Sequence, residues 1–111
     1  MPVPLYQAKA ELFRTLGHPA RIRILELLTE RDQAVHELLA LVEIEASYLS
    51  QQLAVLRRAG LVVQRREGAE VVYAAAVPGV AELMSTARHL LGALLDDRGA
   101  LKAELDRETT A

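Results

Sequence analysis

The spacing of apolar residues changes at Gly60, and this change constrains the fold more than any other feature of the chain. Before Gly60, apolar residues recur at steps of three and four, the pattern of amphipathic helices. After it come two β-branched or aromatic runs, residues 61–63 and 71–73, which indicate a β-hairpin. Beyond Pro78 and Gly79 the helical spacing returns. The pattern predicts a mainly α-helical fold with one small β-hairpin, in the order α-α-α-α-β-β-α.

The ends of the predicted elements follow from local signals. Gly17 ends the first helix, Pro19 suits the first turn of the second, and Gly60 suits the left-handed position after the fourth. The predicted helices before the hairpin span residues 5–16, 19 to about 30, 34–42 and 46–59, with a turn over 42–45. The hairpin has a charged tip over 64–70, which Gly68 turns. A long helix follows over 80–95, continuing weakly through Leu101 and Leu105, and the tail 107–111 is expected to fray.

Composition limits the classes of protein to consider. With 111 residues, 51% of them hydrophobic, the chain predicts a single domain, 1–111, with a modest core. The lack of cysteine excludes disulfides, thiolate metal ligands and thiol redox sensing within these residues. No leader-like start and no apolar run of about 18 residues is present, so we expect a cytoplasmic protein. No Gly-rich phosphate loop or catalytic constellation is present, which predicts that the protein is not an enzyme and has no cofactor.

The helix over 46–59 has two chemically different faces. A helix, a turn and a second helix over 34–59, followed by a ribbon over 61–76, suits DNA, because the major groove admits an α-helix and the ribbon can reach the backbone. On a helical wheel Leu49, Leu53 and Leu56 share one side. Serine, glutamine and arginine occupy the other, and these side chains can bind bases or phosphates. The candidate DNA-binding residues are Ser47, Ser50, Gln51, Gln52, Arg57 and Arg58, with Arg65 and Arg66 in the hairpin as phosphate contacts.

Three strings resemble the ArsR/SmtB family of repressors: residues 16–25 (LGHPARIRIL), residues 49–62 (LSQQLAVLRRAGLV), and residues 65–68 (RREG) followed by Tyr73. The resemblance spans about residues 5–95. It implies a winged helix-turn-helix that represses transcription by binding a palindromic operator, and a homodimer joined through helices 5–16 and 78–98. The apolar faces of these two helices agree, because they exceed what one small core requires. The predicted interface residues are Leu5, Leu12, Leu16, Leu83, Leu90, Leu91 and Leu94.

The chain departs from the family pattern in two places. The family often has histidine where Gln52 stands, and because Gln52 lies on the core flank of its helix, we expect it to position the helix rather than to read bases. The cysteines of metal-sensing members are missing from residues 33–38, and the last helix offers only His89, followed by Asp96 and Asp97. No metal site is therefore predicted. His18, His36 and His89 are assigned structural or exposed roles, and a composite histidine-carboxylate site across a dimer stays open.

Two other functions stay open from the sequence. The first is a winged-helix regulator released by a small organic ligand, in a pocket lined by Tyr6, Phe13, Tyr73 and Met84. The second is a winged-helix module that binds proteins and never DNA, which the net charge of −2 favours and the basic face of helix 46–59 opposes.

Overall fold

The computed structural model describes residues 2–95 and 99–110, and side chains for 2–95 and 103–108. Asp96, Asp97, Ala111 and the end of the predicted helix 78–98 lie outside the described residues, as does the side chain of Leu101. The chain forms two compact units, residues 1–78 and 79–111, and each is described by itself.

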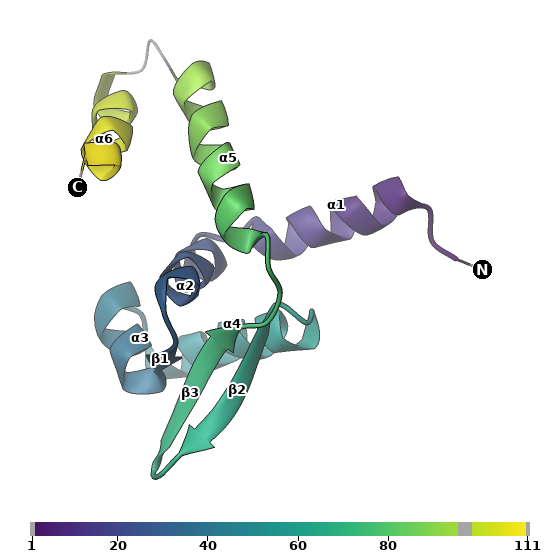
Figure 1. Cartoon of the computed structure of the whole chain (residues 1–111), viewed down its shortest axis with the longest axis vertical. Helices are drawn as coiled ribbons and strands as arrows, with labels where there is room; N and C mark the ends of the chain where they lie inside the picture. The colour runs from purple at the N-terminus through teal and green to yellow at the C-terminus, as the bar shows by residue number, and fades with distance from the viewer. Residues whose placement is uncertain (1, 96–98, 111) are drawn as a thin grey trace. The chain divides into compact units, whose positions relative to one another are not determined.

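The first unit contains the predicted helices and hairpin, so the prediction of a mainly helical fold with a small β-element is confirmed (Figure 1). Its elements are α1 (Leu5–Leu16), α2 (Pro19–Glu30), β1 (Gln33–Ala34), α3 (Val35–Val42), α4 (Ala46–Arg58), β2 (Val62–Glu67) and β3 (Glu70–Ala75). Figure 1 shows the β2–β3 hairpin extending away from the helices of this unit. Glu37 stabilises the start of α3, because its Oε1 accepts the backbone N–H of Ala34 at 2.8 Å. That hydrogen bond, followed by one from Arg31, lowers the pKa of Glu37.

The sheet differs from the predicted hairpin in two respects. It has three antiparallel strands in the order β1-β3-β2, and β1, which pairs Gln33 with Tyr73, was not predicted. Strands β2 and β3 pair from Val62 opposite Ala75 to Glu67 opposite Glu70. The prediction of a charged tip over 64–70 is therefore wrong, since Arg65 and Arg66 lie within a strand. Only residues 68 and 69 form the turn, where Gly68 has the positive φ of 61° that favours glycine.

The core of the first unit lies where α2, α3 and α4 meet the sheet. Ile24 and Leu25 of α2 are fully buried, and Val62 at the start of β2 is 1% exposed. Leu38 of α3 and the inner face of α4 complete this core. Gly60 lets the chain turn from α4 into β2 with a φ of 81°, the left-handed conformation that the sequence predicted for it.

The inner face of α2 provides a direct test of this core. Leu25→Ala is expected to lower the free energy of unfolding by about 2–5 kcal/mol, because it removes a fully buried side chain and leaves a cavity. Leu41→Ala is the matched control, since Leu41 on α3 is 46% exposed, and it is expected to change stability by only about 0.5 kcal/mol. Urea denaturation measures both. Equal losses for the two variants would contradict the described core.

The second unit consists of α5 (Val80–Leu94) and α6 (Gly99–Thr110). The bounds of α5 lie close to the predicted 80–95, but the predicted weak continuation through Leu101 and Leu105 and the predicted frayed tail over 107–111 differ from the structure. The structure instead forms a separate helix that runs to Thr110. Arg88 of α5 donates to Glu108 of α6 at 3.3 Å, so a hydrogen-bonded ion pair joins the two helices. No helix within the described residues is long and apolar enough to span a membrane.

Candidate nucleic-acid interface

The two faces of α4 are separated as the helical wheel predicted. Leu49 and Leu56 are fully buried and Leu53 is 2% exposed, which fixes one side of the helix in the core. Ser47, Ser50, Gln51, Arg57 and Arg58 are exposed on the other side. Ala54, between these residues, is half-buried. The polar side of α4 therefore projects outward from a helix that the core holds in place.

The outward face of α4 carries positive charge without compensation from its own helix. The sequence of α4 contains Arg57 and Arg58 and no acidic residue. Among the side chains that the structure describes, neither arginine forms an ion pair, whereas Arg14, Arg23, Arg31, Arg65 and Arg88 all do. Uncompensated arginines beside serine and glutamine form a surface that can bind an anionic polymer and hydrogen-bond to base edges.

The two hairpin arginines have different surroundings. Successive residues of a strand point to opposite faces, so Arg65 and Arg66 lie on opposite faces of the sheet. Arg65 Nη1 donates to Asp32 Oδ2 at 2.6 Å, and its Nε donates to Glu67 Oε1 at 3.0 Å. The hydrogen bond to Asp32, followed by that to Glu67, raises the pKa of Arg65. Arg66 is exposed and forms no ion pair among the described side chains. Of the two predicted phosphate contacts, Arg66 is therefore the available one.

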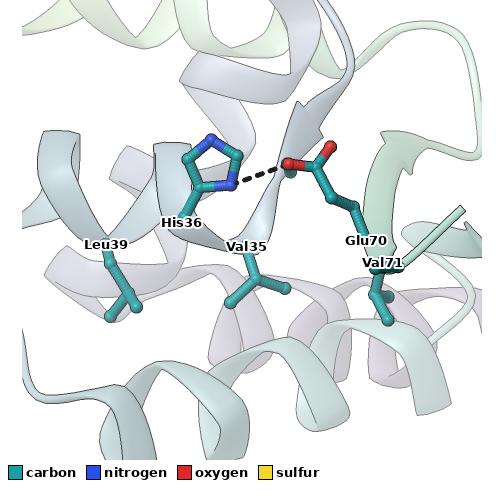
Figure 2. Close-up of a pocket in the computed structure, with 7 residues that line it drawn as sticks. Val35, His36, Leu39, Glu70 and Val71 are labelled. Atoms are coloured by element: carbon teal, nitrogen blue, oxygen red, sulfur yellow. Dashed lines mark ion pairs between the residues drawn. The ribbon is translucent and has the colours of Figure 1, made fainter. Parts of the chain in front are cut away.

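A histidine-carboxylate pair joins α3 to the hairpin next to a shallow hollow. His36 Nδ1 lies 3.2 Å from Glu70 Oε1, and both side chains are exposed (Figure 2). The hollow has a volume of about 430 Å³, and in Figure 2 Val35, Leu39 and Val71 point to one side of the junction beneath the pair. Together with the bond between Arg65 and Asp32, this pair attaches the hairpin to the segment before α4.

Gln52, one of the predicted DNA-binding residues, is buried. Its side chain is 6% exposed, and its Oε1 accepts a hydrogen bond from Arg21 Nε at 2.7 Å. This geometry supports the expectation that Gln52 positions the helix. Burial and this bond argue against a direct contact between Gln52 and DNA, although Gln52 was among the predicted DNA-binding residues.

The predicted interface leucines divide into exposed and buried residues. Leu5 and Leu12 on α1 are 70% and 39% exposed, and Leu90, Leu91 and Leu94 on α5 are at least 45% exposed. Leu83 is half-buried. Leu16 is only 5% exposed in the single chain, so it belongs to the core of the protomer and leaves almost no surface for a partner. Exposed leucines in this number are unusual for a monomer and are typical of a surface that another chain covers.

The two alternative sites that the sequence left open are a metal site and a small-molecule pocket. No group of three or more histidine, aspartate or glutamate side chains able to hold a metal occurs among them. Besides the hollow of Figure 2, a second hollow of about 370 Å³ is lined by residues of α2, the 42–45 turn and α4. Neither is lined by Tyr6, Phe13, Tyr73 or Met84. The ligand pocket of the sequence analysis stays a prediction.

Comparison with known proteins identifies relatives over most of the chain. The family model described as bacterial regulatory protein, arsR family, matches residues 18–63. An uncharacterised HTH-type transcriptional regulator of Mycobacterium tuberculosis, Rv0081, is 57% identical over 103 residues, covering 92% of this chain and 90% of the relative. The biofilm growth-associated repressor of Agrobacterium fabrum is 39% identical over 88 residues, covering 76% of this chain and 75% of the relative.

Solved structures agree with this relationship. The crystal structure of Rv0081 superposes with a TM-score of 0.78 at 58% identity, covering 89% of this chain and all of that one. The solution structure of the homodimeric winged helix-turn-helix DNA-binding domain of Mb0332 from Mycobacterium bovis gives a TM-score of 0.71 at 28% identity, covering 83% and 86% of the two chains.

Proposed function

Because the chain belongs to the ArsR family of bacterial regulatory proteins, whose members regulate transcription and are not enzymes, we propose that it represses transcription by binding a palindromic operator as a homodimer. The observation that carries this proposal is the exposed side of α4. It presents serine, glutamine and arginine, contains no acidic residue, and is backed by leucines that are 2% exposed or less. The name of the Agrobacterium relative, a repressor, supports the direction of regulation.

We assign different tasks to the residues of this face. Gln51 can donate to and accept from adenine in a bidentate pair, and the serines can bond to bases or phosphates. Arg57 and Arg58, in the last turn of α4, can neutralise phosphates or reach guanine. Phosphate contacts fix the register of the protein on the duplex, and base contacts supply the sequence preference.

The homodimer is proposed from the exposed leucines on α1 and α5. The exposed apolar residues of α1 and those of α5 each form a face that a two-fold related copy would cover. Two copies of α4 would then read half-sites about one helical turn apart, which explains why the operator should be a palindrome. The structural relative Mb0332 is described as homodimeric, which supports this assembly.

A binding titration tests the proposed function. Fluorescence anisotropy with a duplex from upstream of the protein's own coding region should show saturable binding that weakens steeply as salt rises, because phosphate contacts release counterions. A shuffled duplex of the same length should bind more weakly. Equal binding to both duplexes would leave only a nonspecific contact, and no binding at low salt would contradict the proposal.

The two hairpin arginines should respond differently to substitution. Arg66→Ala is expected to weaken binding to every duplex and to reduce the slope of log affinity against log salt by about 1 for each lost phosphate contact. Arg65→Ala is the matched control on the opposite face, since its guanidinium is engaged by Asp32 and Glu67. It should leave the slope nearly unchanged. A larger slope change for Arg65→Ala than for Arg66→Ala would contradict the assignment.

A further inference from the structure

Arg21 connects three helices of the first unit through two hydrogen bonds. Its Nε donates to Gln52 Oε1 on α4 at 2.7 Å, and its Nη1 donates to the backbone oxygen of Thr15 on α1 at 3.1 Å. Arg21 itself lies in the first turns of α2. A single guanidinium therefore links the carboxyl end of α1 to the middle of α4.

The charge of Arg21 has an unusual environment for a guanidinium that is half-buried. No carboxylate forms an ion pair with it among the side chains that the structure describes. Its two acceptors are a neutral amide and a backbone carbonyl in the last turn of α1. The carboxyl end of a helix dipole favours a cation, so α1 compensates part of the charge. Hydrogen bonds to acceptors on two different helices fix the guanidinium, so its position depends on both α1 and α4.

We propose that Arg21 is a positioning residue for DNA recognition: it fixes the orientation of α4 by holding Gln52, and it ties that orientation to α1. This inference rests on the proposed function, in which α4 contacts the bases, and it identifies the residue that holds α4 in position. Gln52 lies one residue after Gln51, the candidate base-reading residue. A displacement of α4 at Gln52 would therefore move Gln51 relative to a base edge, while the leucines kept the helix in the core.

The positioning role of Arg21 depends on the planar guanidinium, whose N–H donors point in different directions. Arginine carries several donors in a fixed plane, so it can reach two acceptors on different helices at once. Lysine has one compact ammonium on a flexible stem and cannot reproduce that geometry. The side-chain amide of Gln52 presents one carbonyl oxygen toward this guanidinium, and a glutamate there would present a carboxylate oxygen in the same place.

The two hydrogen bonds of Arg21 also connect α1 to α4, the helix proposed to contact the bases. Much of the apolar face of α1 is exposed in the single chain, with Leu5 70% and Phe13 57% exposed. Covering this face in a dimer would fix the position of α1, and its last turn is where Arg21 is bonded through the backbone oxygen of Thr15. Assembly and base reading would then favour each other, because both stabilise the same arrangement of α1 and α4.

Four variants test the role of Arg21. Arg21→Lys and Gln52→Leu are each expected to reduce the affinity ratio between operator and shuffled duplex about tenfold, the scale of one lost charge-assisted hydrogen bond. The salt slope should stay constant, because the phosphate contacts of Arg57 and Arg66 remain. The double variant should lose little more than either single variant. Gln52→Glu should retain the operator preference, because its carboxylate can accept from Arg21 in place of the amide.

Thermal unfolding of the same variants separates positioning from a purely structural role. The proposal predicts that the preference for operator is lost at temperatures where circular dichroism shows the variants fully folded. Lowered melting temperatures with an unchanged operator preference would overturn it, as would a Gln52→Glu variant that behaves like Gln52→Leu. If Arg21→Lys does not fold, the comparison of Gln52→Leu with Gln52→Glu decides. Failure of the unmodified protein to prefer its operator would instead overturn the proposed function, and this inference with it.

Discussion

Replacing Leu90 and Leu94 by glutamate is expected to convert the protein to a monomer and to weaken operator binding about a hundredfold or more. These leucines lie on one side of α5 and are 60% and 68% exposed in the single chain. Two carboxylates on each copy would be desolvated and would repel each other in a two-fold interface. A monomer engages one half-site and loses the gain in affinity that comes from linking two binding modules. Sedimentation equilibrium measures the assembly, and anisotropy measures the binding.

The control for this prediction lies on the same helix. Ala81 and Ser85 are exposed on the side of α5 opposite Leu90 and Leu94, so the Ala81→Glu, Ser85→Glu double variant adds the same charge without touching the apolar face. It should remain a dimer and lose little affinity beyond the effect of its added charge. A monomer produced by both double variants, or by neither, would contradict the assignment of this face.

Replacing Gln51 by alanine is expected to weaken operator binding about 5- to 150-fold for each half-site that loses its contact, and to relax the sequence preference at one base position of each half-site. The range follows from about 1–3 kcal/mol for a bidentate base contact. Arg57→Ala on the same face should lower affinity for all duplexes more evenly and reduce the salt slope by about 1 per contact. The contrast between the two variants separates base reading from phosphate binding.

The matched controls for α4 lie on the polar side of α1. Gln7→Ala and Arg14→Ala remove the same residue types from exposed positions there. Neither should change the preference between operator and shuffled duplex. If Gln51→Ala and Arg57→Ala bind as tightly as their controls, the exposed side of α4 has no part in recognition.

The helices and the two faces of α4 could be predicted because their causes are local. Leucines at three- and four-residue spacing determine which side of α4 is buried, and Gly60 has the backbone conformation that ends a helix. The outward position of Gln51 and Arg57 follows from the same periodicity. The cysteine-free departure from the family's metal sites was likewise readable from the residues alone.

The features that were missed depend on contacts between distant residues. Strand β1 forms because Gln33 and Ala34 pair with β3. Its two residues are too few to show the alternation of apolar and polar residues that predicts a strand. Asp32 engages Arg65 across 33 positions of sequence, and Arg21 engages Gln52 across 31. Charged and polar residues of these types occur all along the chain, and the sequence carries no signal of which ones meet. The hairpin tip was misjudged because the polar residues 64–67 resemble a turn, whereas pairing with β3 extends the strand through them.

Selection of bound sequences from random duplex DNA tests the central claim most directly. The unmodified protein should enrich an inverted repeat with half-sites about one helical turn apart. The Gln51→Ala variant should enrich the same repeat with one position in each half relaxed. Enrichment of no sequence at low salt, or the same fully specified repeat from both proteins, would contradict the claim that the exposed side of α4 reads the operator.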